Sequence, residues 1–261
     1  MFTNNHKKGV YKMLKTERQE MILETLQNCR HTTAAALCEQ LFASYSSIRR
    51  DLEELENMGL IRRSYGRVEL AGRNPLLVSY PIRINKNAEQ KRIIASKAAR
   101  LIKEGDTLFI DPSSSCSFFA REILHMKGIT VITNNVEVIN IMTQSSINVI
   151  CSGGLQTEPN RYALTGPIAE STFRNIHADW AVFSVRSLTS GGKLYDVHYS
   201  ETALRKVMLE NAAKSLFLCD SSKLGTDSPY YQCSLDDVDY MVCNSKESKK
   251  YLKDYPGLKL L

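Results

Sequence analysis

The sequence predicts an α/β protein of two domains, a small N-terminal domain of helices with one β-hairpin and a larger domain built on a mostly parallel sheet. The 261 residues exceed the usual size of one domain. Apolar residues first recur at helical spacing, and beyond residue 90 short β-rich runs alternate with helix-like segments. We place the domains at residues 13–70 and 91–261, with a linker at 71–90, which holds two prolines and little periodicity.

Composition and charge narrow the class of protein. The net charge is +6, with +3 in residues 1–73 and +3 in the remainder, which alone is weak support for a nucleic-acid partner. Seven cysteines with no C-x-x-C pair favour a reducing compartment over a disulfide framework or a zinc site. Since neither a signal peptide nor an apolar run of roughly 18 residues is found, we expect a soluble, cytoplasmic protein with no cofactor, metal or membrane partner.

Three short helices are predicted in the first domain. Apolar spacing places the first helix at residues 15–28 and the second at 33–41. Ser44 can cap a third helix that Gly59 ends, and its apolar stripe is Ile48, Leu52 and Leu55. Helices of this length joined by tight turns are typical of a helix-turn-helix.

The third helix has polar and basic residues first and acidic residues later. At 3.6 residues per turn, Arg49 and Arg50 lie roughly 100° and 200° around the helix from Ile48, so neither is buried with the apolar stripe. A recognition helix presents its N-terminal half to the major groove of DNA. The residues that we expect to contact DNA from this helix are Ser44, Tyr45, Ser46, Ser47, Arg49 and Arg50.

A β-hairpin follows the third helix. Residues 60–70 form two β-prone runs around Ser64-Tyr65-Gly66, as in the wing of a winged helix-turn-helix. Arg62, Arg63 and Arg67 on this wing are suited to contact the DNA backbone or minor groove. Periodicity alone leaves open the alternative that the domain binds another protein.

The first domain resembles the DeoR family of bacterial regulators. The segments ERQEMILETL and SYSSIRRDLEELENMGLIRR are similar to the family's helix-turn-helix, which ends in a Ser-x-x-Thr-Ile-Arg-Arg-Asp-Leu run. Ser47 stands where the family usually has Thr and keeps the hydroxyl. The wing departs further, because Tyr65, Gly66 and Arg67 replace the common His-Gly-Gly. The resemblance implies a winged helix-turn-helix that binds DNA.

The second domain is predicted to be a parallel sheet covered by helices on both faces. The β-rich runs are residues 107–110, 129–133, 147–151, 180–185, 215–219 and 240–243. The helical candidates between them are residues 89–103, 115–126, 135–144, 165–175, 199–212 and 246–253.

Small and polar residues follow five of these strands, where ligands of parallel sheets bind. The loop at Ser113–Ser117 opens a helix whose free amides favour an anion, and Lys223 can complete a phosphate or carboxylate cradle. The alternative is that these are ordinary polar loops. The effector-binding candidates are Asp111, Ser113, Ser114, Ser115, Thr133, Asn134, Gly153, Gly154, Asp179 and Lys223.

The DeoR resemblance extends over nearly the whole chain. The family's sensor domain resembles ribose-5-phosphate isomerase, with motifs such as Thr-Asn-Ser, Asp-x-x-Phe and Asp-Ser-Ser-Lys-x-Gly. Phe183 comes after Asp179-Trp180, and Asp220 through Gly225 match the last of these motifs, and the resemblance implies that the candidates line an effector pocket. Pro112-Ser113-Ser114-Ser115 departs from the family's Ser-Gly-Thr-Thr, which restricts the backbone there.

Together these patterns imply a sequence-specific DNA-binding transcription regulator, a repressor of carbohydrate metabolism genes controlled by a small phosphorylated sugar. The expected partners are double-stranded operator DNA, a sugar phosphate effector and a second copy of the chain, in a homodimer or homotetramer. The alternative is a sugar-phosphate enzyme of the isomerase type, with acid and base groups among Asp111, Asp179 and Glu201.

Overall fold

The computed structural model describes residues 15–29, 31–57, 60–71, 80–156 and 160–261. The chain divides into two compact units, Met1–Val78 and Ser79–Leu261. Each unit has its own buried core and is described by itself.

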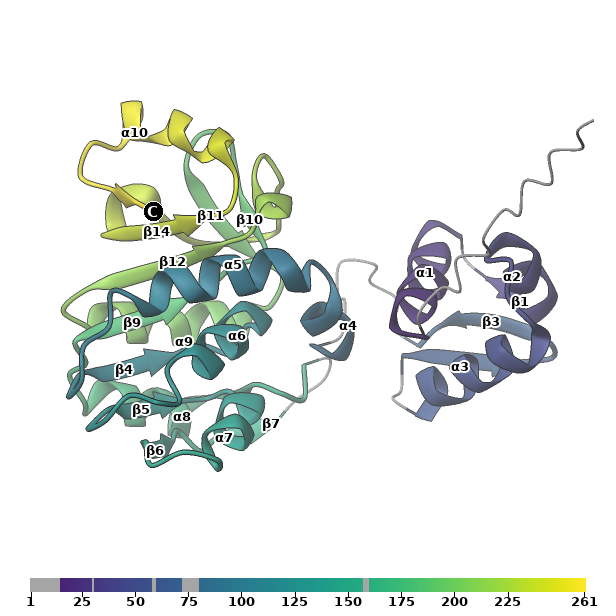
Figure 1. Cartoon of the computed structure of the whole chain (residues 1–261), viewed down its shortest axis with the longest axis horizontal. Coiled ribbons are helices and arrows are strands. Elements are labelled where there is room, and N and C mark those ends of the chain that lie inside the picture. Colours follow the sequence, from purple (N-terminus) through teal and green to yellow (C-terminus); the bar gives the residue numbers. More distant parts are fainter. Residues whose placement is uncertain (1–14, 30, 58–59, 72–79, 157–159) are drawn as a thin grey trace, which may run out of the picture. The chain divides into compact units, whose positions relative to one another are not determined.

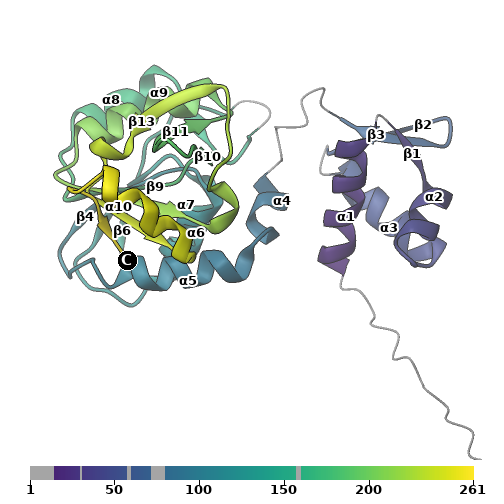
Figure 2. The same ribbon diagram turned by 90° about the horizontal axis from the view of Figure 1, so that it is seen from above.

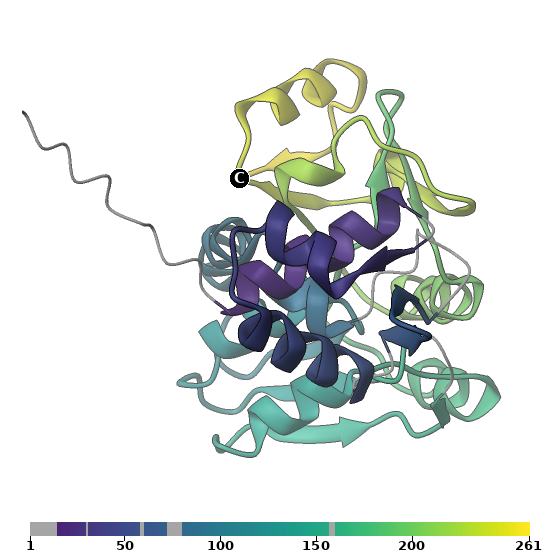
Figure 3. The same cartoon turned by 90° about the vertical axis from the view of Figure 1, so that its right-hand side faces the viewer.

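The first unit is a winged helix-turn-helix. Its elements in chain order are α1 (Lys15–Asn28), β1 (Thr32–Thr33), α2 (Ala34–Gln40), α3 (Tyr45–Asn57), β2 (Ile61–Ser64) and β3 (Arg67–Leu70). The three helices cluster beside an antiparallel sheet of order β1-β3-β2 (Figure 2, Figure 3). The predicted helices and hairpin are confirmed, whereas Gly59, expected to end α3, lies outside the described residues. The core is formed by buried apolar residues of the three helices, of the turn after α2 and of the wing strands: Ile22, Leu23, Leu26, Leu37, Leu41, Ile48, Leu52, Leu55, Ile61 and Val68.

The wing closes through a two-residue turn with left-handed backbone. Tyr65 has φ +49° and Gly66 has φ +77°, the conformation that joins two twisted antiparallel strands most tightly. Glycine adopts it without strain, and tyrosine does so only rarely. The side chain of Tyr65 is therefore held at the tip of the hairpin, where it is fully exposed.

The second unit is built on a seven-stranded sheet of order β15-β14-β12-β9-β4-β5-β6, in which every neighbouring pair is parallel. This confirms the predicted parallel sheet. The strands are β4 (Thr107–Ile110), β5 (Thr130–Thr133), β6 (Asn148–Cys151), β9 (Trp180–Phe183), β12 (Ser215–Cys219), β14 (Tyr240–Cys243) and β15 (Lys259–Leu260).

Helices cover both faces of this sheet (Figure 1). One face packs against α5 (Ala88–Ala99), α6 (Ser114–Glu122) and α7 (Val136–Met142), through buried side chains such as Ile94, Phe119 and Val138. The other packs against α8 (Pro167–Arg174) and α9 (Tyr199–Glu210), through Phe173 and Leu204. The expected two-sided covering is confirmed.

Some elements of the second unit were not expected. A small antiparallel sheet of order β10-β11-β13 shares an apolar cluster with β9, β12 and β14 of the large sheet, and a short pair, β7 with β8, follows β6. The bounds are β7 (Leu155–Gln156), β8 (Leu164–Thr165), β10 (Ser187–Leu188), β11 (Lys193–Asp196), β13 (Tyr230–Ser234) and α10 (Tyr251–Asp254). No helix of the described residues is long and apolar enough to cross a membrane.

The second unit also begins earlier than predicted. Helix α4 (Tyr80–Asn85) and the first turn of α5 occupy residues that the sequence assigned to a linker at 71–90. Tyr80 is buried in the second unit, since only 2% of its surface is exposed. The last predicted helix, 246–253, is instead a 3-10 segment, Lys246–Lys250, followed by α10.

Candidate functional site

Helix α3 presents one polar face to solvent. Ile48, Leu52 and Leu55 bury the opposite face in the core of the first unit. Arg49 and Arg50 are both exposed, and the Arg50 Nε donates to the Ser46 carbonyl at 3.2 Å. The predicted DNA-contacting residues of the turn and helix are brought together on this face; Ser47 is half-buried, and the exposed members are Ser44, Tyr45, Ser46, Arg49 and Arg50.

The wing arginines do not have equal roles. Arg62 and Arg67 are exposed on the hairpin. The Arg63 guanidinium instead contacts the Glu56 carboxylate of α3, with the Nε at 2.7 Å, and its backbone N–H donates to the same carboxylate at 3.0 Å. These contacts lower the pKa of Glu56. The Arg63 charge therefore helps to attach the wing to α3, while Arg63 itself stays exposed, and its contact with DNA remains a prediction.

In the second unit, the carboxyl ends of the parallel strands meet at one edge of the sheet, and buried polar residues gather there. Asp111 follows β4, and its Oδ2 accepts from the Ser184 N–H that follows β9, at 3.2 Å. Asn135 follows β5, and its Nδ2 donates to the Asp111 carbonyl at 3.1 Å. Each of these three residues is buried. The loops after separate strands therefore form one polar site.

The N-terminus of α6 lies in this site. The Asp111 Oδ1 accepts from the Ser113 N–H at 2.9 Å, and the Ser113 Oγ caps the helix by accepting from the Cys116 N–H at 3.2 Å. Ser114 and Ser115 occupy the first turn, where backbone N–H groups have no intrahelical acceptor. Donors of this kind, with the helix dipole behind them, suit an anion.

Some of the predicted effector-binding residues have a free polar atom at the site, whereas others only hold the local fold. The Asn134 Nδ2 donates to the Leu164 carbonyl at 2.9 Å, while its Oδ1 is buried and has no partner among the described residues. Gly154 has φ +111°, and a Cβ there would lie 2.6 Å from the Thr165 carbonyl oxygen. Gly154 thus permits the close approach of β7 to β8, whereas Asn134 keeps one acceptor available. Thr133 is structural in a similar way, since its Oγ1 donates to the Ile110 carbonyl at 2.7 Å.

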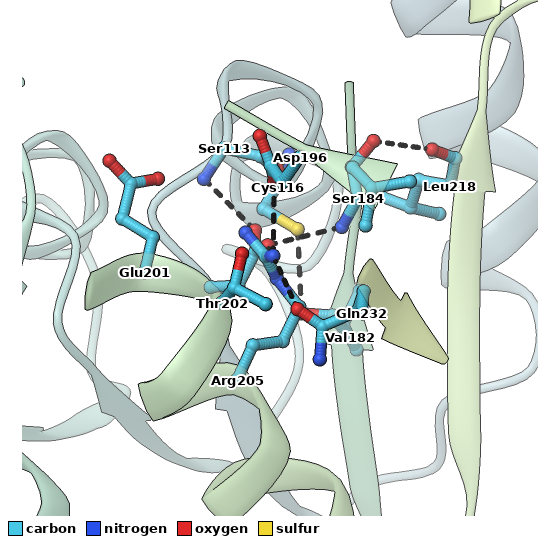
Figure 4. A network of polar contacts seen from close by, with 12 residues as sticks. Ser113, Cys116, Val182, Ser184, Asp196, Glu201, Thr202, Arg205, Leu218 and Gln232 are labelled. Atoms are coloured by element: carbon cyan, nitrogen blue, oxygen red, sulfur yellow. Dashed lines mark hydrogen bonds and ion pairs between the residues drawn. The ribbon is translucent and has the colours of Figure 1, made fainter. Parts of the chain in front are cut away.

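An arginine that the sequence reasoning missed lies at the centre of the polar network (Figure 4). Arg205 of α9 is 1% exposed; its Nε lies 2.8 Å from the Asp111 Oδ2, and its Nη1 lies 3.0 Å from the Asp196 Oδ2. The Nη1 also donates to the Gln232 Oε1 at 2.9 Å. Although burial alone would lower the pKa of Arg205, the neighbouring carboxylates raise it above its usual value. The one sequence signal was a charged residue on the inward face of a predicted helix.

Two further titratable groups, His198 and Glu201, lie at the N-terminal end of α9. The Glu201 Oε1 accepts from the Asn160 Nδ2 at 2.7 Å and lies 3.9 Å from the His198 Nε2. Burial, opposed by the charge of Arg83 and assisted by Asp196, raises the pKa of Glu201 to about 7. Burial and the Arg83 charge lower the pKa of His198 to about 4, so this imidazole is neutral near pH 7.

Lys223 follows β12 at this same edge of the sheet, and its charge is partly used by the fold; its contact with an effector remains a prediction. The Nζ donates to the Val185 carbonyl at 2.6 Å and lies 3.6 Å from the Asp220 Oδ2. Burial alone would raise the pKa of Asp220, yet the Lys223 charge and hydrogen bonds from Ser222 hold that pKa below its usual range.

Asp179 is not part of the site. It precedes β9 rather than following it, so it lies at the opposite edge of the sheet from Asp111. Its Oδ2 accepts from the backbone N–H of Thr107, the first residue of β4, at 2.8 Å, and its side chain is otherwise at the surface. The prediction that Asp179 binds the effector is wrong, since the motif match ignored which end of the strand the residue occupies. Among the described residues, no group of three His, Cys, Asp or Glu side chains could hold a metal ion.

Comparisons with known proteins agree with this architecture. Residues 18–73 match the family described as DeoR-like helix-turn-helix domain, and residues 86–245 match the DeoR C terminal sensor domain. The HTH-type transcriptional regulator GolR of Listeria innocua serovar 6a is 30% identical over 244 residues, 93% of this chain and 96% of that protein. The L-fucose operon activator of Escherichia coli (strain K12) is 31% identical over 238 residues, 90% and 97% of the two chains.

A more distant relative is the glycerol-3-phosphate regulon repressor of Escherichia coli (strain K12), 27% identical over 230 residues, 87% of this chain and 90% of that protein. Among solved structures, ribose 5-phosphate isomerase A from Methanocaldococcus jannaschii has a TM-score of 0.40 and 18% identity over 53% of this chain and 55% of the isomerase. The two domain matches and the relatives of nearly full length show that this chain belongs to the DeoR family of transcriptional regulators.

Proposed function

We propose that this DeoR-family chain is a sequence-specific transcription regulator, a repressor of carbohydrate metabolism genes that a small phosphorylated sugar controls. The observation that carries the DNA-binding part is the polar face of α3, where Arg49 and Arg50 project opposite a fully buried apolar stripe. A helix with this division can enter the major groove while its other face holds the domain together. A helix-turn-helix usually binds two half-sites as a pair, so we propose a homodimer or homotetramer in the cytoplasm.

The proposed effector site is the polar edge of the second unit. Its polar groups suit both parts of a sugar phosphate, the phosphoryl group and the sugar hydroxyl groups. The first turn of α6 offers N–H donors to a phosphoryl group, with Lys223 as a nearby cation. The buried Asn134 Oδ1 needs a donor, which a sugar hydroxyl supplies. The name of one relative, a glycerol-3-phosphate regulon repressor, agrees with a phosphorylated effector.

The alternative function, sugar-phosphate isomerisation, has less support. Of the three candidate acids, Asp111 is held by Arg205 and Asp179 lies at the opposite edge of the sheet. Glu201 has a pKa of about 7, as a general base requires, but its carboxylate accepts from the Asn160 amide within the protein. We propose that the site binds its ligand without converting it.

The test is operator binding by the full chain, with the DNA upstream of its own gene. Arg49→Ala and Arg50→Ala should each weaken specific binding by about 1–3 kcal/mol, roughly 5- to 150-fold, because each loses a contact to a base or a phosphate. Arg174→Ala is the control, since this arginine of α8 is exposed and pairs only loosely with Glu170 at 3.5 Å among the described residues. Fluorescence anisotropy at several salt concentrations measures the affinity, and sugar phosphates are then added. Unchanged affinity in both α3 variants would reject the proposed mode of DNA binding.

A further inference from the structure

Arg83 of helix α4 is a half-buried cation with two donors that the fold does not use. Its guanidinium Nε and Nη2 are both buried and have no hydrogen-bond partner among the described residues. Its guanidinium carbon lies 5.4 Å from the centroid of the Tyr80 ring, one turn earlier on the same helix. Buried N–H donors without an acceptor are costly, because they have lost their hydration and gained no other hydrogen bond. A ligand that accepts from both donors would remove this cost.

The ring beneath Arg83 is fixed to the effector site. Tyr80 stacks on Tyr162 with ring centroids 4.4 Å apart. The Tyr80 hydroxyl is hydrogen-bonded to the Ser117 hydroxyl in α6. The Ser117 Oγ also accepts from the Asn135 Nδ2 at 3.3 Å. Arg83 therefore lies over a platform that is bonded to α6 close to its N-terminus and to the residue that follows β5.

Other basic groups face Arg83 from different elements. Burial, and then the charge of Arg83, lower the pKa of Arg186, which follows β9, although Asp196 and Asp220 oppose this fall. The same two causes lower the pKa of His198, which precedes α9. Glu201 is close enough for Arg83 to oppose the rise of its pKa, yet no ion pair joins the two side chains within the described residues.

We propose that Arg83 binds the effector, with its Nε–H and Nη2–H donated in parallel to the phosphoryl group at the N-terminus of α6. This inference rests on the proposed effector site and names a ligand residue that the sequence assigned to a linker. Nε and Nη2 form the side-on fork of a guanidinium, which matches two oxygens of one phosphate.

The position of Arg83 in the chain would allow its contact with the phosphoryl group to affect DNA binding. Helix α4 is the first element of the second unit, immediately after the boundary with the DNA-binding unit. The Arg83 carbonyl of α4 and the Lys86 carbonyl just after the helix both accept from the Lys91 Nζ of α5, so the C-terminal end of α4 is attached to α5. A phosphate bound by Arg83 would hold the helix at a second point. Effector binding would then act on the segment that leads to the DNA-binding unit.

The test uses the full chain, and calorimetric titration with inorganic phosphate is the direct measurement. Arg83→Gln should weaken phosphate binding at least tenfold, because two charged donors are lost. The phosphate affinity of Arg83→Lys should lie between those of the wild type and Arg83→Gln, since an ammonium group keeps the charge but cannot make the parallel pair of hydrogen bonds. Arg174→Gln on α8 should bind phosphate as the wild type does. Operator affinity without phosphate should be the same in all four proteins.

Stability separates a ligand role from a structural role. If Arg83 serves the ligand, Arg83→Gln should unfold at the same temperature or higher than the wild type without phosphate, because two buried donors without a partner are removed. Wild-type binding of phosphate by Arg83→Gln, a marked fall in its unfolding temperature, or no phosphate binding by the wild type would each overturn the inference. The proposed function is decided separately, by whether sugar phosphates change operator binding of the wild type.

Discussion

Glu201 is a buried carboxyl group that changes its protonation near neutral pH. Burial raises its pKa from 4.5 to about 7; the charge of Arg83 opposes this rise, and Asp196 adds to it. The Asn160 amide and Arg205 also stabilise the carboxylate, so the net shift is the excess of burial and like charge over these contacts. Because the folded state holds the proton more tightly than the unfolded chain, folding is favoured at low pH and loses free energy as the pH rises through 4.5 towards 7.

Glu201→Gln should therefore stabilise the protein in a pH-dependent way. At pH 5 the variant and the wild type should differ little, since the wild-type carboxyl is protonated in the fold. At pH 8 the variant should be more stable by about 2 kcal/mol, because a buried ionised carboxylate is replaced by an amide that can still accept from Asn160. Urea unfolding at both pH values measures this, with Glu210→Gln, at the exposed end of the same helix, as the control. Parallel pH profiles for Glu201→Gln and the wild type would contradict it.

At the scale of the elements, helix α3 is fixed to its neighbours by the acids of its second half. Asp51 is 1% exposed, and its carboxylate accepts from the Nε and Nη2 of Arg18 in α1. Glu54 accepts from the Lys15 Nζ at 2.6 Å, and Glu56 contacts Arg63 of the wing. These contacts set the position of the polar face of α3 relative to α1 and the hairpin.

Asp51→Ala should destabilise the first unit by about 3 kcal/mol, because Arg18, whose side chain is only 14% exposed, would lose a charged partner. Glu53→Ala, an exposed acid two residues later, is the matched control and should change stability by less than about 0.5 kcal/mol. Urea unfolding followed by circular dichroism measures both variants. Equal stabilities would mean that the Asp51 contact contributes nothing to holding α1 against α3.

The sequence predicted those elements and site residues whose signals are local. Ile48, Leu52 and Leu55 reveal α3 by spacing alone, and the parallel strands stand out as short apolar runs. Asp111 could be placed because residues after parallel strands share one edge. The sheet β10-β11-β13 could not be predicted, since its strands are short and β11 pairs with β13 across the intervening α9 and β12. Arg205 and Arg83 were missed for the same reason, because long-range packing, not spacing, brings them into the site.

At the scale of the whole molecule, the two units have separate cores, so their stabilities can be measured separately. The chain has a single tryptophan, Trp180, which is 5% exposed in the sheet of the second unit. Its fluorescence therefore reports on the second unit, whereas helical circular dichroism reports on both. Ligand that binds only the folded second unit should stabilise that unit by about 2.7 kcal/mol at a hundredfold excess over its dissociation constant.

We expect the full chain to unfold in two transitions that respond to different changes. Asp51→Ala should lower the transition seen by circular dichroism alone and leave the Trp180 transition unchanged, because Asp51 contacts only the first unit in the described residues. A sugar phosphate that weakens operator binding should raise the Trp180 transition, and this rise should be lost in Arg83→Gln. A single transition that both changes shift together would show that the units unfold as one. Coupling between effector and DNA would then have to pass through a shared folded state rather than through α4.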